Sequence, residues 1–129
     1  MSKRKGQRRE REAKELLEEN GYRVSIAKNH RFGANDYFNL FDLLAVGPGP
    51  VKLIQVKANS ARGITKTGKK ASVFCPEDHV DVEYWTCHDR EGWRIQRLTR
   101  HSPENPAWET LIDERNRDGN MGDYVPEVL

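Results

Sequence analysis

Two short apolar runs joined by a compact turn constrain the fold of this chain more than any other feature. The first covers residues 40–46 (LFDLLAV) and the second residues 51–57 (VKLIQVK), with the turn GPGP at 47–50 between them. A turn of this composition brings neighbouring strands together as a hairpin. Side chains two residues apart lie on one face of a strand, so Gln55 and Lys57 share a face. The pattern predicts a β-sheet with polar groups gathered at one place.

Asp42 lies inside the first of these runs, among apolar residues. A carboxylate is costly to bury unless a partner or a metal ion compensates for its charge. A helix is predicted over residues 7–20, followed by Asn20-Gly21 as a stop signal. Glu10 precedes Ala13 by three residues on this helix, so both lie on its inward face. The sequence therefore directs a second carboxylate toward the sheet that carries Asp42.

This set of groups is the one that metal-assisted phosphodiester hydrolysis requires. Mg²⁺ prefers hard oxygen ligands and takes few carboxylates from the protein, and Mn²⁺ can replace it. The predicted metal ligands are Glu10, Asp42, the side-chain oxygen of Gln55 and the main-chain carbonyl of Val56. Lys57 is predicted to hold the nucleophilic water or to balance charge on the phosphate. The predicted catalytic residues are Glu10, Asp42, Gln55 and Lys57.

Each of these residues also has a structural explanation when it is taken alone. An Asp near a strand end can cap a turn, and a Lys can protect an edge strand from aggregation. A Glu in a first helical turn complements the helix dipole. A shared site is favoured because the three residue types occur together around one predicted hairpin.

The rest of the chain alternates between strand and helix patterns within one predicted domain, residues 1–129. A mixed α/β fold with helices flanking a sheet is expected. The predicted elements are a strand at 22–26, a loop at 28–39, a mobile basic loop at 58–70, a short helix opening at 76–79, a hairpin formed by 82–87 and 93–98, and a C-terminal helix over 106–115.

The net charge of +2 conceals an uneven distribution of charge. Residues 1–11, which include a basic arm at 1–8, hold six basic residues against one acidic residue. The acidic C-terminal segment, residues 101–129, holds seven acidic residues against two basic ones. Basic segments on both sides of the Asp42 hairpin favour a nucleic-acid backbone as partner, although a basic N-terminus can also be a merely solvated arm. The predicted DNA contacts are Arg4, Lys5, Arg8, Arg9, Arg11, Arg62, Lys66, Lys69 and Lys70.

Several classes of protein are disfavoured by the sequence. No apolar stretch approaches the roughly 20 residues of a membrane span, and the basic N-terminus lacks the apolar core of a secretory signal. A cytoplasmic location is expected, in a host cytoplasm if the protein is viral. The pairs Cys75/His79 and Cys87/His88 contain zinc-ligand types, but adjacent strand residues face opposite ways. Both cysteines are therefore predicted to be packing residues.

Three blocks of the sequence resemble archaeal-type Holliday junction resolvases, within the restriction-endonuclease-like PD-(D/E)XK superfamily. Residues 4–11 (RKGQRRER) resemble the family's R-K-G-x-x-x-E-R opening. Residues 41–44 (FDLL) resemble its P-D-[IL]-[IL] block, with Phe41 in place of the Pro. Residues 53–57 (LIQVK) resemble its I-E-x-K block, with Gln55 in place of the Glu. The similarity extends from residue 4 to about residue 59.

The resemblance implies a restriction-endonuclease-like mixed β-sheet flanked by helices, and a homodimer that nicks opposing strands of a four-way DNA junction. It also implies that Glu10, Asp42, Gln55 and Lys57 occupy the family's catalytic positions, with Asp36 as a further polar residue before the Asp42 strand. Gln55 keeps an oxygen ligand but removes one negative charge, which weakens metal affinity. Two alternatives stay open: another nuclease of this fold (a nickase, exonuclease or restriction-type enzyme) acting on duplex DNA, and a catalytically silent DNA-binding module.

Overall fold

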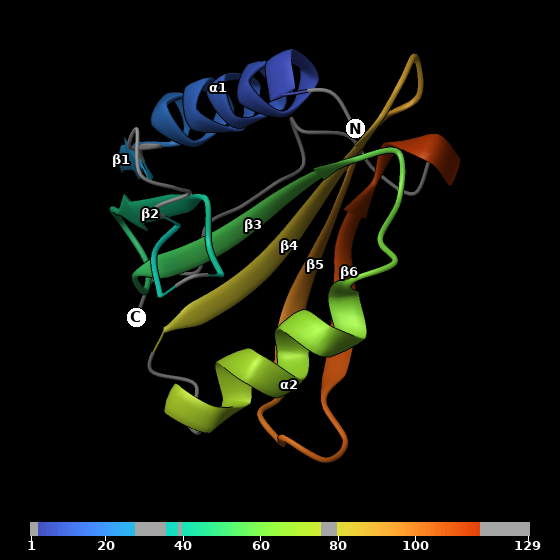
Figure 1. Ribbon diagram of the computed structural model, residues 1–129. Helices are drawn as coiled ribbons and strands as arrows, with labels where there is room; N and C mark the ends of the chain where they lie inside the picture. Colours follow the sequence, from blue (N-terminus) through green and yellow to red (C-terminus); the bar gives the residue numbers. More distant parts are fainter. Residues whose placement is uncertain (1–2, 28–35, 39, 76–79, 117–129) are drawn as a thin grey trace.

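A computed structural model describes residues 3–27, 36–38, 40–75 and 80–116 of the chain. It contains one mixed sheet and two α-helices (Figure 1). The elements in chain order are α1 (Lys3–Glu19), β1 (Arg23–Ile26), β2 (Leu43–Val46), β3 (Lys52–Ala58), α2 (Ile64–Phe74), β4 (Asp81–His88), β5 (Gly92–Arg100), β6 (Ala107–Asp113) and a 3-10 turn, η1 (Glu114–Asn116).

The six strands follow one another across the sheet in sequence order. Every neighbouring pair is antiparallel except β3 and β4, which run parallel. Parallel neighbours need a crossover connection, and α2 lies in that connection. The two predicted hairpins, β2–β3 and β4–β5, are confirmed. The short helix expected at residues 76–79 falls outside the described residues.

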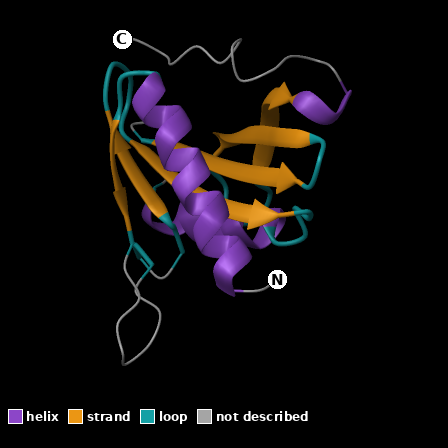
Figure 2. Ribbon diagram, turned by 90° about the horizontal axis from the view of Figure 1, so that it is seen from above, coloured by secondary structure: helices purple, strands orange, loops and turns teal. Residues whose placement is uncertain are grey.

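The sheet buries both of its faces, and a different helix covers each face (Figures 1 and 2). Ala13 and Leu17 of α1 are fully buried in one apolar cluster, against strand residues such as Ile54 and Trp85. Ala71 of α2 belongs to the second cluster, on the opposite face. The predicted mixed α/β architecture is confirmed in this three-layer form.

Helix α1 begins earlier than the sequence predicted, at Lys3 instead of residue 7. Most of the predicted basic arm, residues 1–8, is therefore helical. The helix ends at Glu19, and Gly21 then adopts a positive φ of 91°. This is the left-handed conformation that glycine adopts without steric cost, so the predicted stop signal is confirmed.

The predicted mobile loop at 58–70 is wrong for most of its length, because α2 starts at Ile64. The inward side of α2 is made of small and polar residues: Thr67, Gly68, Ala71 and Ser72 are all buried. A Cβ at Gly68 would lie 2.9 Å from the Cβ of Pro106, so only glycine permits this close approach. These four buried residues include no large apolar side chain. The sequence therefore lacks the apolar periodicity by which a packed helix is predicted.

The predicted C-terminal helix at 106–115 is also wrong, because residues 107–113 form the edge strand β6. Gln96 pairs with Thr110 and Ile95 pairs with Ile112, which leaves Leu111 as an extra residue in the strand. Leu111 and Ile112 therefore both pack on the α1 face, while Trp108 packs on the α2 face. A bulge of this kind gives apolar spacings of three and four residues, which imitate the period of a helix.

A buried lysine ties the start of β3 to β4 on the α1 face. The side chain of Lys52 is 2% exposed, and its Nζ lies 2.9 Å from Asp81 Oδ2 and 2.5 Å from Glu83 Oε2. Trp85 Nε1 donates a hydrogen bond of 2.8 Å to Glu83 Oε1. The carboxylates of Asp81 and Glu83 are thus buried with a cation between them.

Replacing this lysine is expected to destabilise the fold strongly. Lys52→Met leaves two carboxylates buried without their cation, which costs about 3–5 kcal/mol of unfolding free energy. Urea denaturation followed by circular dichroism measures the loss. The triple variant Lys52→Met/Asp81→Asn/Glu83→Gln removes all three charges and is expected to recover most of the stability. A single variant as stable as the wild type would contradict this account.

Candidate functional site

The site lies where β2 and β3 separate. Their ladder ends at the pair Leu43–Ile54, just after which the Asp42 N–H donates to the Ile54 carbonyl at 2.9 Å. The next N–H of β3 that points toward β2 belongs to Val56, and it donates a hydrogen bond to Asp42 Oδ2 at 2.8 Å. The carboxylate of Asp42 thus replaces a strand carbonyl as the partner of Val56. The two strands can diverge there without leaving this amide unpaired.

Glu10 of α1 approaches this fork from the inward face of its helix, as the sequence predicted. Burial, together with repulsion from Asp42 and Asp36, raises the pKa of Glu10 to about 7. Burial likewise raises the pKa of Asp42 to about 6, although the Val56 N–H and Lys57 oppose this shift while Asp36 adds to it. Three carboxyl groups and one lysine therefore interact at the fork. Perturbed carboxyl groups of this kind are frequent at functional sites.

Gln55 and Lys57 both point away from the α1 cluster, as strand alternation predicted. Helix α2 contacts the Gln55 side chain through Thr67, whose hydroxyl donates a 2.6 Å hydrogen bond to Gln55 Oε1. Lys57 lies near enough to Asp42 to lower its pKa. Glu10 and Lys57 therefore each interact electrostatically with Asp42, and Gln55 lies two residues before Lys57 on the same face of β3.

Two further residues border this group, Thr67 and Tyr84, and neither was predicted from the sequence. Tyr84 pairs with Gln55 across β3 and β4, and its hydroxyl lies beside Gly63, where the chain enters α2. Burial raises the pKa of Tyr84, the backbone N–H of Gly63 opposes the shift, and Asp42 adds to it. Thr67 stood in the segment interpreted as a loop. Its helical spacing to the buried Ala71 and Cys75 was the signal available for placing it on a helix.

The donor set at the fork fits a divalent cation that binds oxygen. Two half-buried carboxyl groups with raised pKa values repel one another, and a cation between them would relieve that repulsion. The N–H and C=O groups of one strand residue point the same way, so the Val56 carbonyl faces the gap beside Asp42. Within the described part of the chain, no three His, Cys, Asp or Glu side chains are placed to hold a metal together. A metal here would therefore also depend on Gln55, the Val56 carbonyl or water.

The predicted DNA contacts differ in how accessible they are. Most of the described ones carry exposed side chains: Arg8, Arg11, Arg62, Lys66, Lys69 and Lys70. Arg9 is the exception, because its side chain is only 13% exposed and forms ion pairs with Glu12 and Asp89. The side chains of Arg4 and Lys5 fall outside the described residues.

The two cysteines lie on opposite faces of the sheet. Cys75 belongs to the cluster under α2 and Cys87 to the cluster under α1, and both are free thiols. Their prediction as packing residues is confirmed. His79 lies outside the described residues. Among the helices that the structure describes, none has both the length and the apolar character needed to cross a membrane.

Comparison with known proteins finds a similar fold among solved structures. No protein-family model and no curated protein sequence matches this chain. Among solved structures, Hjc, a Holliday junction resolvase from the archaeal hyperthermophile Archaeoglobus fulgidus, is similar, with a TM-score of 0.55 and 17% sequence identity. The match covers 88% of this chain and 100% of Hjc. The chain therefore has a restriction-endonuclease-like α/β fold, which confirms the fold expected from the three sequence blocks.

Neutralising Asp42 is expected to stabilise the metal-free protein. The folded state raises the pKa of Asp42 from 3.8 to about 6, so ionising this group opposes folding. Asp42→Asn removes that cost and keeps an oxygen acceptor for the Val56 N–H. The gain is expected to grow between pH 4 and pH 6 and to level off above, at about 1–2 kcal/mol after allowance for solvent screening.

Chemical denaturation at a series of pH values, in the presence of a chelator, measures this gain. Asp113→Asn is the matched comparison. Arg115 lowers the pKa of Asp113, so replacing Asp113 should reduce the free energy of unfolding. An Asp42→Asn variant that is less stable than wild type throughout this pH range would show that the carboxylate is not under electrostatic strain.

Proposed function

We propose that this protein is a metal-dependent DNA endonuclease whose active site lies at the fork between β2 and β3. The observation that carries the proposal is the pair of carboxyl groups, Glu10 and Asp42, whose pKa values are raised to about 7 and about 6 at that fork. A fold built for stability alone gains nothing from this arrangement. The fold similarity to a Holliday junction resolvase supports a nuclease in particular.

Mg²⁺ is the proposed cofactor, and Mn²⁺ is expected to replace it. The residues that would hold it are Asp42 and Glu10, together with the Gln55 amide oxygen and the Val56 carbonyl. When bound, the cation would lower the pKa of an attacking water and neutralise charge on the scissile phosphate. Because Gln55 is neutral, the site has one negative charge fewer than a site with a carboxylate at this position. Metal binding is therefore expected to be weaker.

The remaining groups have roles that follow from their positions. Lys57 carries a positive charge beside Asp42, where it can hold the nucleophilic water or contact the phosphate. Thr67 positions Gln55 through its hydroxyl. In the geometry described, this hydroxyl donates to the amide oxygen. A reversed amide would instead donate to Thr67 and turn its oxygen toward the metal, and both orientations are open to a Gln side chain.

The DNA substrate would be held by phosphate contacts from two sides of the fork. Arg8 and Arg11 are exposed on α1, and Arg62, Lys66, Lys69 and Lys70 are exposed on α2 and the loop before it. Such contacts supply affinity and orientation without reading sequence. The protein is therefore proposed to recognise the shape of DNA.

A four-way junction is the proposed preferred substrate. Resolving a junction requires two nicks in opposing strands, and one chain contains one fork. Two copies related by a two-fold axis would supply both sites, so a homodimer is proposed. A nuclease that acts on other DNA is the second candidate, because the fork itself contains nothing specific for a junction.

Cleavage of a labelled four-way junction beside a linear duplex of matched sequence tests this proposal. Wild type with Mg²⁺ or Mn²⁺ is expected to make paired, symmetric nicks in the junction and to cut the duplex much more slowly. Asp42→Asn is expected to lower the cleavage rate by about 10³-fold, since several kcal/mol of transition-state stabilisation depend on the metal. Its affinity for the junction in calcium or in chelator should stay within about threefold of wild type.

The alternatives give different results in the same assay. Equal cutting of junction and duplex would contradict junction selectivity and leave a nuclease of broader substrate range. No cutting by wild type with any divalent metal, combined with salt-sensitive DNA binding, would contradict the nuclease and identify a DNA-binding module. Sedimentation of the protein on a junction tests the dimer, and one protomer per junction would contradict it.

A further inference from the structure

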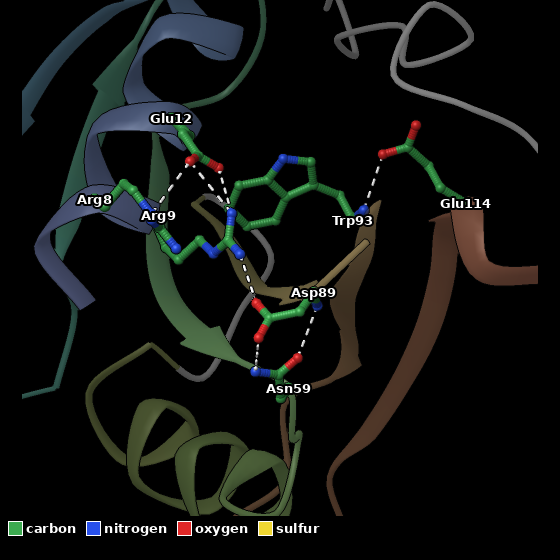
Figure 3. A network of polar contacts seen from close by, with 7 residues as sticks. All are labelled: Arg8, Arg9, Glu12, Asn59, Asp89, Trp93 and Glu114. Atoms are coloured by element: carbon green, nitrogen blue, oxygen red, sulfur yellow. Dashed lines mark hydrogen bonds and ion pairs between the residues drawn. The ribbon is translucent and has the colours of Figure 1, made fainter. Parts of the chain in front are cut away.

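Arg9 is much more buried than the arginine that precedes it on α1. Its side chain is 13% exposed, whereas that of the neighbouring Arg8 is 55% exposed. Arg9 Nη1 donates to both oxygens of Glu12, at 2.9 and 3.2 Å, and Nη2 donates to Asp89 Oδ1 at 2.6 Å (Figure 3). The Arg9 guanidinium thus joins α1 to the turn between β4 and β5.

The Asp89 carboxylate also connects this network to Asn59, just after the end of β3. Asp89 Oδ2 accepts a 3.1 Å hydrogen bond from Asn59 Nδ2, and the Asp89 N–H donates to Asn59 Oδ1 at 2.8 Å (Figure 3). The Asn59 N–H also donates to the Cys87 carbonyl at 2.9 Å. Asn59 has a φ of 62°, a left-handed conformation that Asn tolerates better than most residues. Three polar contacts therefore fix the chain just after β3.

These contacts join two segments that carry the proposed active-site residues. Arg9 directly precedes Glu10, and Asn59 follows Lys57 by two residues. The buried apolar side chains of α1 among the described residues, Ala13 and Leu17, lie on the C-terminal side of Glu10. The apolar core therefore anchors the later turns of α1, and the Arg9 ion pairs anchor the turn that presents Glu10.

We propose that Arg9, Asp89 and Asn59 form a positioning network that holds Glu10 and Lys57 at a fixed separation across the fork. This inference rests on the proposed nuclease function. Arg9 is then a positioning residue and not a contact to DNA, unlike the exposed Arg8 and Arg11. Its carboxylate partners, Asp89 and Glu12, which also lies 3.9 Å from Arg8 Nε, offset the positive charge that a phosphate contact would need.

Two variants that preserve the charge or the shape of the network test this role. Arg9→Lys keeps the positive charge but loses the planar guanidinium, which contacts Glu12 through Nη1 and Asp89 through Nη2, so it cannot reproduce both contacts in the same geometry. Asp89→Asn keeps the shape but replaces one of the two acceptor oxygens with an NH2 group, which cannot accept the hydrogen bond from Arg9 or from Asn59. Each variant is expected to lower kcat for junction cleavage about tenfold or more, since small displacements of catalytic groups are costly.

The KM for DNA separates positioning from DNA contact. Asp89→Asn makes the surface more positive, so its KM should stay the same or fall while kcat falls. Arg8→Met provides the comparison for a true phosphate contact, with a raised KM and a salt dependence of binding reduced by about one unit. Lys14→Met removes a cation from an exposed ion pair with Glu18 elsewhere on α1, and it should change neither kcat nor KM.

Calorimetry of Mg²⁺ binding without DNA gives a readout that is independent of activity. Asp89→Asn and Arg9→Lys are expected to weaken Mg²⁺ affinity about tenfold, as substitutions behind metal ligands typically do, and Lys14→Met to leave it unchanged. The double variant Arg9→Lys/Asp89→Asn should lose no more than the worse single variant, because both break the same link.

The two proposals fail in different ways. An active wild type combined with unchanged kcat and Mg²⁺ affinity in both variants would overturn the positioning network alone. A raised KM with unchanged kcat in Arg9→Lys would show that Arg9 contacts DNA. An inactive wild type would overturn the nuclease, and in that case the Mg²⁺ affinities of the variants still decide whether the network organises a metal site.

Discussion

The hydrogen bond from the Val56 N–H to the Asp42 carboxylate is the contact on which the arrangement of the site depends. It closes the end of the β2–β3 ladder with a side chain and lets the two strands diverge. The gap that results receives Glu10 from α1 on one side and borders Gln55 and Lys57 on the other. One polar contact in the sheet thus determines where carboxyl groups from two elements approach one another.

The carboxyl groups at this fork differ from the buried carboxylates described elsewhere in the protein, which have oppositely charged partners. Lys52 lies between Asp81 and Glu83, and Asp113 is paired with Arg115 at 2.9 Å. Glu10 and Asp42, in contrast, face one another and Asp36, and their pKa values rise because burial and repulsion outweigh the help from Lys57. The fold compensates its structural charges and leaves these carboxyl groups under strain. Groups that bind a cation or a reacting phosphate need such a property, because the free energy released on binding includes the relief of that strain.

The sequence predicted the fork well because its signals are local. The two runs around the GPGP turn specified a hairpin and its alternation, and the helical spacing of Glu10, Ala13 and Leu17 specified which face of α1 turns inward. It failed at α2 and β6, where tertiary packing decides the structure. Gly68 and its small neighbours make a helix that is packed without large side chains, and the bulge at Leu111 gives a strand the spacing of a helix. Arg9 could not be distinguished from Arg8 by sequence, since its partner Asp89 lies 80 residues away along the chain.

A divalent cation at the fork is the feature on which the proposed chemistry depends, and paramagnetic NMR can detect it. Mn²⁺ added to ¹⁵N-labelled protein broadens signals within roughly 15 Å of the bound ion. Substoichiometric Mn²⁺ is expected to broaden first the amide signals of Glu10, Asp42, Gln55 and Val56. Mg²⁺ should reverse the effect, and Asp42→Asn should abolish it. Broadening confined to the acidic residues after position 101, or spread evenly over the surface, would contradict a metal site at the fork and with it the proposed chemistry.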